Sequence, residues 1–250
     1  MAVSDSVLEY FNQANGGRIA FRRRAGRTPT LMFLPGYASD MAGAKAVALD
    51  SFAAQRGLAM LRFDYSGTGA SSGRFEDGTL ERWLDEALAV LDALSDGPLV
   101  LVGSSMGGWI ALHLALRRPE RVAALVGIAA APDFTDWGYT PALKAELRER
   151  GRILRDNPYG GAAQLTTLQF WQSGERLKLL AAPIDIGCPV RLIHGHADSD
   201  VPLPVAIKLL DRLRSADVQL NIIKDGGHRL SQPHEIEAIL RTVAGLLETL

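Results

Sequence analysis

The sequence predicts a fold of the α/β class, in which helices cover both faces of a mostly parallel β-sheet. Short apolar runs recur along the 250 residues, and amphipathic segments with helical spacing separate most of them. This alternation is typical of parallel strands that are buried on both faces. Because no linker, repeat or low-complexity tract divides the chain, we expect one domain over residues 1–250.

The apolar runs place the strands, and the amphipathic segments between them place the helices. Two antiparallel strands, Val7–Phe11 and Arg18–Arg23, open the chain. Apolar runs then predict the rest of the sheet at Thr30–Leu34, Leu58–Phe63, Leu99–Val102, Val122–Ile128, Val190–His194 and Val218–Lys224. Helical spacing predicts helices at Ala42–Arg56, Thr79–Ser95, Trp109–Arg118, Pro204–Arg214 and His234–Leu250.

Between residues 134 and 187 the alternation of strands and helices stops. Two helix-like stretches, Ala142–Leu154 and Ala162–Leu180, fill much of this segment. At roughly 50 residues it is too long for an ordinary connection, and we expect a functional lid inserted into the domain. Its aromatic residues are candidates for substrate binding, with packing inside the lid as the alternative: Trp137, Tyr139, Phe170 and Trp171.

Charge and composition exclude several classes of protein. The chain carries 27 Lys and Arg against 28 Asp and Glu, so it has no long-range attraction for nucleic acid or an anionic membrane. No apolar run approaches the ~18 residues of a membrane span. The single cysteine, Cys188, excludes an internal disulfide and fits a reducing compartment. Residues 1–12 lack the features of a secretory or transit segment, and we expect a cytoplasmic protein.

The stretch Gly103-Ser104-Ser105-Met106-Gly107 lies between a predicted strand and a predicted helix. In that context G-x-S-x-G is typical of a nucleophile elbow, a sharp turn that holds a serine hydroxyl clear of the backbone. Glycines let the strand and the helix approach each other without a clash of Cβ atoms. Ser105 has a glycine two residues away on either side, whereas Ser104 does not. We therefore expect Ser105 to be the nucleophile.

A serine nucleophile needs a general base and a group that orients the base. On an elbow of this kind the chain order is serine, acid, histidine. His228 lies directly after the last predicted strand, where a base can reach back to Ser105. Asp198, in the loop after the preceding strand, is the first candidate for the acid. Asp200 and then Asp133 are the alternatives.

The oxyanion of an acyl-transfer intermediate needs two N–H donors already in place. The backbone N–H groups of Met106, which follows the nucleophile, and of Tyr37, in the loop after Thr30–Leu34, are the candidates. The Tyr37 side chain either lines the site or packs. We expect no metal, because His194 and His196 have no third ligand at a recognisable spacing, and no cofactor, because no dinucleotide or phosphate-binding pattern follows a strand.

The elbow, the loop Leu34-Pro35-Gly36-Tyr37, the segment His194–Pro202 and His228 together resemble the α/β-hydrolase family over essentially the whole chain. Phe63-Asp64-Tyr65-Ser66-Gly67, Gly108-Trp109 and His228-Arg229 resemble its abhydrolase branch of palmitoyl-protein thioesterases and acyl-glucuronide esterases. The resemblance implies a serine hydrolase for thioesters or activated esters with an apolar acyl group. It also implies the roles of nucleophile, acid and base for Ser105, Asp198 and His228.

The sequence therefore predicts hydrolysis through an acyl-enzyme, on a small-molecule or acyl-protein substrate. Two alternatives stay open. One is other chemistry on the same fold, such as C–C bond hydrolysis or perhydrolysis. The other is a non-catalytic member that binds a small apolar ligand.

Overall fold

An eight-stranded sheet forms the centre of the computed structural model, which describes residues 6–13, 16–157, 159–160 and 163–250. Its strands are β1 (Leu8–Asn12), β2 (Arg18–Arg24), β3 (Arg27–Leu34), β4 (Leu58–Phe63), β5 (Leu99–Ser104), β6 (Val122–Ile128), β9 (Val190–Gly195) and β10 (Val218–Ile223). They lie in the order β1-β2-β4-β3-β5-β6-β9-β10. Strand β2 runs antiparallel to both of its neighbours, β1 and β4. The strands from β4 to β10 are all parallel to one another.

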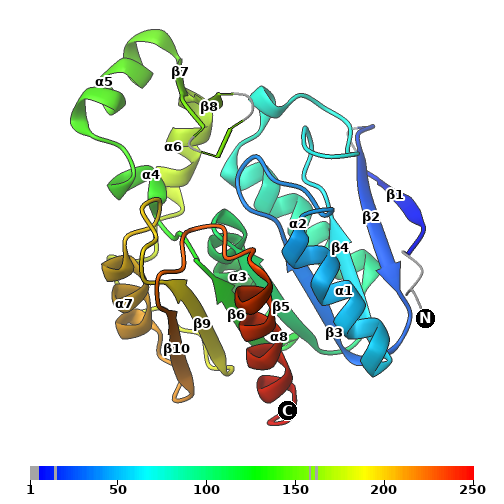
Figure 1. Cartoon of the computed structure of the whole chain (residues 1–250). Helices are drawn as coiled ribbons and strands as arrows, with labels where there is room; N and C mark the ends of the chain where they lie inside the picture. The colour runs from blue at the N-terminus through cyan, green and yellow to red at the C-terminus, as the bar shows by residue number, and fades with distance from the viewer. Residues whose placement is uncertain (1–5, 14–15, 158, 161–162) are drawn as a thin grey trace.

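Helices cover both faces of the sheet (Figure 1). They enclose two apolar layers. α1 (Ala44–Arg56) and α8 (Pro233–Leu247) pack on one face. α2 (Leu80–Leu94), α3 (Met106–Arg117) and α7 (Leu203–Arg212) pack on the other. Every residue of β5 and of β9 is buried, as strands between two helical layers must be. The predicted α/β architecture is confirmed.

Between β6 and β9 the chain builds a separate group of elements, here called the insertion (residues 134–187). It contains α4 (Phe134–Trp137), α5 (Pro141–Arg150), the antiparallel strands β7 (Arg152–Arg155) and β8 (Gln164–Thr167), and α6 (Leu168–Arg176). In Figure 1 these elements lie above the main sheet, beyond the ends of its parallel strands. Within the described part of the chain, no helix combines the length and apolar character needed to span a bilayer.

The two helices predicted in the insertion are wrong in extent, because the β7–β8 hairpin takes part of both. Gly151 has a φ of +73° and ends α5, so the chain turns into β7 where the sequence analysis extended the helix to Leu154. The second predicted helix began at Ala162, which lies outside the described residues. α6 starts only at Leu168, after the Thr167 hydroxyl has accepted the Phe170 N–H as an N-cap.

The junction of β5 and α3 leaves no space for side chains at two of its glycines. A Cβ on Gly103 would lie 2.3 Å from the carbonyl oxygen of Gly107. A Cβ on Gly107 would lie 2.0 Å from the carbonyl oxygen of Leu34, at the end of β3. Helix α3 therefore begins in direct backbone contact with β5 and β3, which sets the position of the residue at the turn.

We expect Gly107→Ala to destabilise the protein by about 2 kcal/mol or more, because overpacking against fixed backbone forces a shift of α3. The free energy of unfolding in urea measures this. Gly245→Ala in α8 is the matched control, since nothing lies within 4 Å of its added Cβ. It should be neutral or stabilising by up to about 1 kcal/mol. Equal stability of the two variants would contradict the packing argument.

Candidate active site

Ser105 occupies the turn between β5 and α3 in a conformation that is unusual for a residue with a side chain. Its φ is 54° and its ψ is −118°, a strain of about 1–3 kcal/mol that persists only where the surroundings enforce it. Its N–H donates to the carbonyl oxygen of Ile128 at 2.9 Å, and its own carbonyl oxygen accepts from the N–H of Ala131 at 3.1 Å. The end of β6 and the residues after it therefore hold the serine in place.

Three side chains from three loops meet at the carboxyl edge of the sheet. His228 Nε2 lies 3.1 Å from Ser105 Oγ, and His228 Nδ1 lies 2.9 Å from Asp198 Oδ2. Asp198 follows β9, and His228 lies between β10 and α8. The structure thus brings together the serine, the acid and the base that the sequence analysis selected. An ionised Asp198 makes Nδ1 the protonated nitrogen and leaves Nε2 to accept the serine proton.

The Asp198 carboxylate has a hydrogen-bond partner on each of its oxygens. Oδ1 accepts from the N–H groups of Asp200 and Val201 at 2.9 and 2.8 Å, and Oδ2 accepts from His228. Burial raises the pKa of Asp198, but the hydrogen bond and charge of His228 and the Val201 N–H outweigh it, and the net pKa lies below its ordinary value. The group is therefore ionised at neutral pH.

His194 is a second histidine beside the same carboxylate, and the sequence did not indicate this contact. It is fully buried at the end of β9, with Nε2 at 2.8 Å from the Val201 carbonyl oxygen and 3.6 Å from Asp198 Oδ2. The Val201 backbone is thus held through its N–H by Asp198 and through its carbonyl oxygen by His194. In the sequence, the only signal for this role of His194 was its position at the end of a predicted strand, four residues before Asp198.

The alternative acids have other partners in the structure. Asp200 is exposed, and its Oδ2 accepts from the Tyr159 hydroxyl at 2.9 Å. Asp133 accepts two backbone N–H groups at the base of the insertion, one on each carboxylate oxygen. Asp198 is the candidate that contacts the histidine.

The predicted oxyanion donors flank Ser105 on either side. Met106 is the first residue of α3, so its N–H has no acceptor within the helix and lies at the positive end of the helix dipole. On the other side, a Cβ on Gly36 would lie 3.4 Å from Ser105 Cβ, so the chain that leads into Tyr37 passes directly beside the serine. The geometry keeps both N–H groups as candidates for one oxygen-binding position.

A cavity of about 1030 Å³ opens beside Ser105 and His228. One part of its wall is aromatic and comes from three different segments, of which α4 supplies two rings: Tyr37, Phe75, Phe134 and Trp137. The rest is polar and includes charged side chains that the sequence analysis did not select: Asp40, Lys45, Arg155 and Arg229. Burial, and then the nearby Arg229, lower the pKa of Lys45 to about 8. Adjacency to His228 was the available signal for Arg229.

The four aromatic residues predicted to bind substrate are divided by the structure. Trp137 lies on the cavity wall. Tyr139 and Trp171 are buried in a small apolar core inside the insertion. Phe170 is buried in the main core, with its ring centroid 4.7 Å from that of Tyr37. Tyr139, Phe170 and Trp171 are thus not among the residues that line the cavity, and their rings pack the insertion on itself and on the sheet domain.

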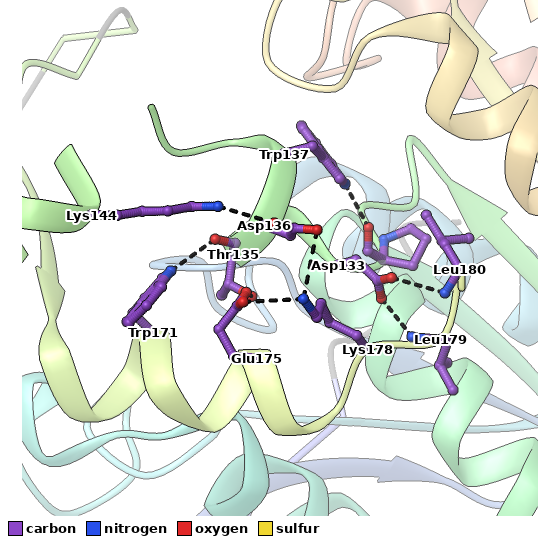
Figure 2. A network of polar contacts seen from close by, with 11 residues as sticks. Asp133, Thr135, Asp136, Trp137, Lys144, Trp171, Glu175, Lys178, Leu179 and Leu180 are labelled. Carbon is purple, nitrogen blue, oxygen red and sulfur yellow. Dashed lines mark hydrogen bonds and ion pairs between the residues drawn. The ribbon is translucent and has the colours of Figure 1, made fainter. Parts of the chain in front are cut away.

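The base of the insertion is fastened by one buried carboxylate (Figure 2). Asp133, just before α4, accepts the N–H groups of Leu179 and Leu180, just after α6, each at 2.8 Å. The two ends of the insertion are thus joined at a single side chain. Burial raises the pKa of Asp133 more than these two hydrogen bonds lower it.

Further polar contacts brace α4 against α6 around this carboxylate, as Figure 2 shows. The Thr135 hydroxyl donates to Glu175 at 2.9 Å, and the Trp171 indole donates to the Thr135 carbonyl oxygen at 2.8 Å. Lys178 pairs with Glu175 at 3.2 Å and with Asp136 at 3.6 Å. The two helices nearest the sheet are therefore cross-linked through side chains from both.

Two side chains of helix α3 also contact the insertion, at Leu177 directly after α6. Trp109 Nε1 donates to the Leu177 carbonyl oxygen at 3.1 Å, and His113 Nε2 lies 2.9 Å from the same oxygen. Burial lowers the pKa of His113 to about 4, so its ring is neutral and can donate from Nε2. Helix α3 thus begins beside Ser105 and, further along its length, contacts the base of the insertion.

Comparisons with known proteins match this geometry. A family model described as the alpha/beta hydrolase fold matches residues 29–151. The human "Palmitoyl-protein thioesterase ABHD10, mitochondrial" is 37% identical over 247 residues, which are 97% of this chain and 81% of that protein. The chain belongs to the α/β-hydrolase family. The sequence-based resemblance to that family and to its thioesterase branch is confirmed.

Solved structures agree with the sequence relatives of this hydrolase. The mouse alpha/beta hydrolase domain-containing protein 10 superposes with a TM-score of 0.92 at 36% identity, over 98% of this chain and 99% of that one. A putative hydrolase from Agrobacterium vitis S4 gives a TM-score of 0.90 at 40% identity, over 97% and 98% of the two chains. The resemblance extends through the insertion as well as the sheet.

The predicted cytoplasmic location is overturned by these comparisons, because the human, orangutan and mouse relatives are named as mitochondrial proteins. The arguments for the cytoplasm came from the absence of a leader-like composition and from the single cysteine. A lone cysteine excludes an internal disulfide in any compartment. It therefore does not distinguish the cytoplasm from the mitochondrion.

We expect Asp133→Asn to lower the free energy of unfolding by about 1–3 kcal/mol, because the amide nitrogen of asparagine cannot accept the second backbone N–H and leaves it unpaired. Asp136→Asn is the control from the same network, since its carboxylate is half exposed and pairs only with lysines, which contributes about 0–1 kcal/mol. Urea denaturation of both variants measures the difference. A larger loss for Asp136→Asn would contradict the assignment of Asp133 as the main fastening.

Proposed function

We propose that this α/β hydrolase is a serine hydrolase that cleaves thioesters or esters with an apolar acyl group through an acyl-enzyme. The observation that carries the proposal is the continuous hydrogen-bonded series from Ser105 Oγ through the His228 ring to Asp198. A hydroxyl, a neutral imidazole and an ionised carboxylate in this order activate a serine for nucleophilic attack. The strained backbone of Ser105 supports the same role, since such strain concentrates at active sites.

The reaction takes two steps that use the same residues. His228 Nε2 takes the proton of Ser105 Oγ as the oxygen attacks the acyl carbonyl carbon, and then donates it to the leaving thiol or alcohol. Asp198 stabilises the imidazolium that forms in between. The N–H groups of Met106 and Tyr37 bind the oxyanion. Water, deprotonated by His228, then attacks the acyl-enzyme and releases the carboxylic acid and free Ser105.

Two observations support an apolar acyl group. The aromatic part of the cavity wall, from Tyr37 to Trp137, gives hydrocarbon a surface on which each buried CH₂ contributes about 0.8 kcal/mol. The human and mouse relatives are named as palmitoyl-protein thioesterases. The insertion supplies Phe134, Trp137 and Leu165 to the wall, so we assign it the role of a cap over the acyl group. An acylated protein and an acylated small molecule both satisfy this chemistry.

Ser105→Ala should abolish turnover of p-nitrophenyl butyrate and labelling by a fluorophosphonate probe, because the attacking oxygen is lost. The fold should be retained, as far-ultraviolet circular dichroism would report. Ser104→Ala, at the adjacent residue of β5, is the matched control and should be labelled like the wild type. Labelling of the Ser105→Ala protein at full rate would refute the serine mechanism.

Asp198→Asn should lower kcat by roughly 10³–10⁴-fold, since the amide favours the wrong tautomer of His228. Asp200→Asn should change kcat by only a few-fold, because its carboxylate contacts the Tyr159 hydroxyl at the surface. Steady-state kinetics on the same ester compare the two. A greater loss for Asp200→Asn would identify Asp200 as the acid.

Matched thioesters and oxygen esters of increasing acyl length separate the proposed chemistry from the alternatives. We expect kcat/KM to rise with acyl length until the aromatic wall is filled, because the added methylenes bind in the cavity. An enzyme that is labelled at Ser105 yet hydrolyses neither series would point to another reaction on this fold, such as C–C bond hydrolysis.

A further inference from the structure

The backbone of Tyr37 is part of the loop between β3 and Met41, here called the oxyanion loop. Its side chain contacts the insertion. Its peptide follows Gly36, where an added Cβ would lie 3.4 Å from Ser105 Cβ. Its hydroxyl donates to the carbonyl oxygen of Leu165 in β8, 128 residues further along the chain, at 2.5 Å. One residue therefore connects the place where the oxyanion forms with the hairpin of the insertion.

The Tyr37 ring lies among aromatic rings from both parts of the molecule. Its centroid is 4.7 Å from that of Phe170 and 6.1 Å from that of Phe134, both in the insertion. On the other side it is 5.1 Å from Phe75 and 5.9 Å from Trp83. Burial of the hydroxyl raises the pKa of Tyr37, so the phenol keeps its proton and donates throughout the physiological range.

The far end of the oxyanion loop is fixed independently of Tyr37. The Met41 N–H donates to Asp64 Oδ1 at 2.7 Å, and the Met41 carbonyl oxygen accepts from Arg62 at 2.9 Å. Between Met41 and the end of β3 the loop is partly exposed, and Ala38 has a φ of 53°. Within this stretch the Ser39 N–H donates to the Gly36 carbonyl oxygen at 3.2 Å, and the Tyr37 side chain anchors the resulting turn to the insertion.

The acceptor of this hydrogen bond is itself held firmly. β8 pairs with β7 in an antiparallel hairpin, in which Leu165 lies opposite Leu154. The insertion that carries the hairpin is fastened to the sheet domain by Asp133 and by the contacts of α3 with Leu177. The position of the Leu165 carbonyl relative to Ser105 is thus set through packed and hydrogen-bonded structure.

We propose that the phenol of Tyr37 is a positioning group for the oxyanion site, through which the insertion sets the place of the Tyr37 backbone N–H. This inference rests on the proposed serine mechanism. A donor that is already in place costs no reorganisation when charge develops on the substrate oxygen. Loss of the hydroxyl frees the middle of the loop, and the donor then has to be ordered in the transition state. The effect falls on kcat, because the ground state makes little use of the oxyanion contact.

The test compares two Tyr→Phe variants whose hydroxyls bond to adjacent residues of β8. Tyr37→Phe keeps the ring and removes the hydrogen bond to Leu165. Tyr139→Phe is the matched control: its hydroxyl pairs with Thr166 Oγ1 at 2.9 Å and with Arg155 at 3.3 Å, and its ring is buried inside the insertion and does not line the cavity. We expect Tyr37→Phe to lower kcat for p-nitrophenyl butyrate about tenfold with KM within twofold, and Tyr139→Phe to leave both within twofold.

A trifluoromethyl ketone inhibitor gives a readout that loose packing alone would not move. It forms a tetrahedral adduct with a serine and places an oxyanion in the site, so its affinity for Tyr37→Phe should fall in proportion to kcat/KM. Thermal unfolding checks that the two variants lose similar stability.

Unchanged kcat in Tyr37→Phe, or equal losses of kcat in both variants, would overturn the positioning role. Inhibitor affinity that stays at the wild-type value while kcat falls would overturn it too. Failure of the serine mechanism itself is distinguishable, because the wild-type protein would then escape fluorophosphonate labelling at Ser105.

Discussion

The site depends on one steric constraint, the close backbone contact among β3, β5 and α3. Gly103 and Gly107 permit it, and Ser105 is held between them in a conformation that it would not adopt alone. The strain of a single residue is small compared with the apolar layers packed on both faces of the sheet, so the fold can hold it. The same contact starts α3 beside the serine and brings Gly36 past it. The positions of the proposed nucleophile and of the proposed oxyanion donors thus all depend on this one turn.

The acid and base loops are organised differently, by polar contacts of buried groups. Asp198 orders its own loop through the Val201 N–H, and His194 holds the carbonyl group of the same residue. A buried carboxylate is costly unless all its partners are supplied, and here the backbone and His228 supply them. The proposed catalytic acid, Asp198, is therefore also the structural centre of its loop. This double role explains why Asp198, rather than the more exposed Asp200, contacts the histidine.

Local patterns in the sequence were enough to predict most strands, the turn at Ser105 and the loops of Asp198 and His228, because each depends on neighbouring residues. The β7–β8 hairpin was missed because its strands are short and follow a helix-like stretch. The left-handed backbone of Gly151 is what separates α5 from β7. The roles of the insertion aromatics could not be predicted, since buried and cavity-lining rings have the same composition. Lys45 and Leu165 reach the site through pairings with residues more than a hundred positions away, which no spacing in the sequence encodes.

The single carboxylate that joins the two ends of the insertion has a consequence for how this family can diversify. With Asp133 bound to Leu179 and Leu180, the chain between them is a closed loop whose ends stay together whatever lies in its middle. Closing a longer loop of this kind costs little, about 0.6 kcal/mol for each doubling of length. Where the insertion does not contact the sheet domain, residues can therefore be added, deleted or exchanged without disturbing β6 or β9, whereas Phe170 and Leu177 are held by the main core and by α3. The strand β8, whose Leu165 accepts from Tyr37, is also constrained. A change of length there would shift the loop beside Ser105.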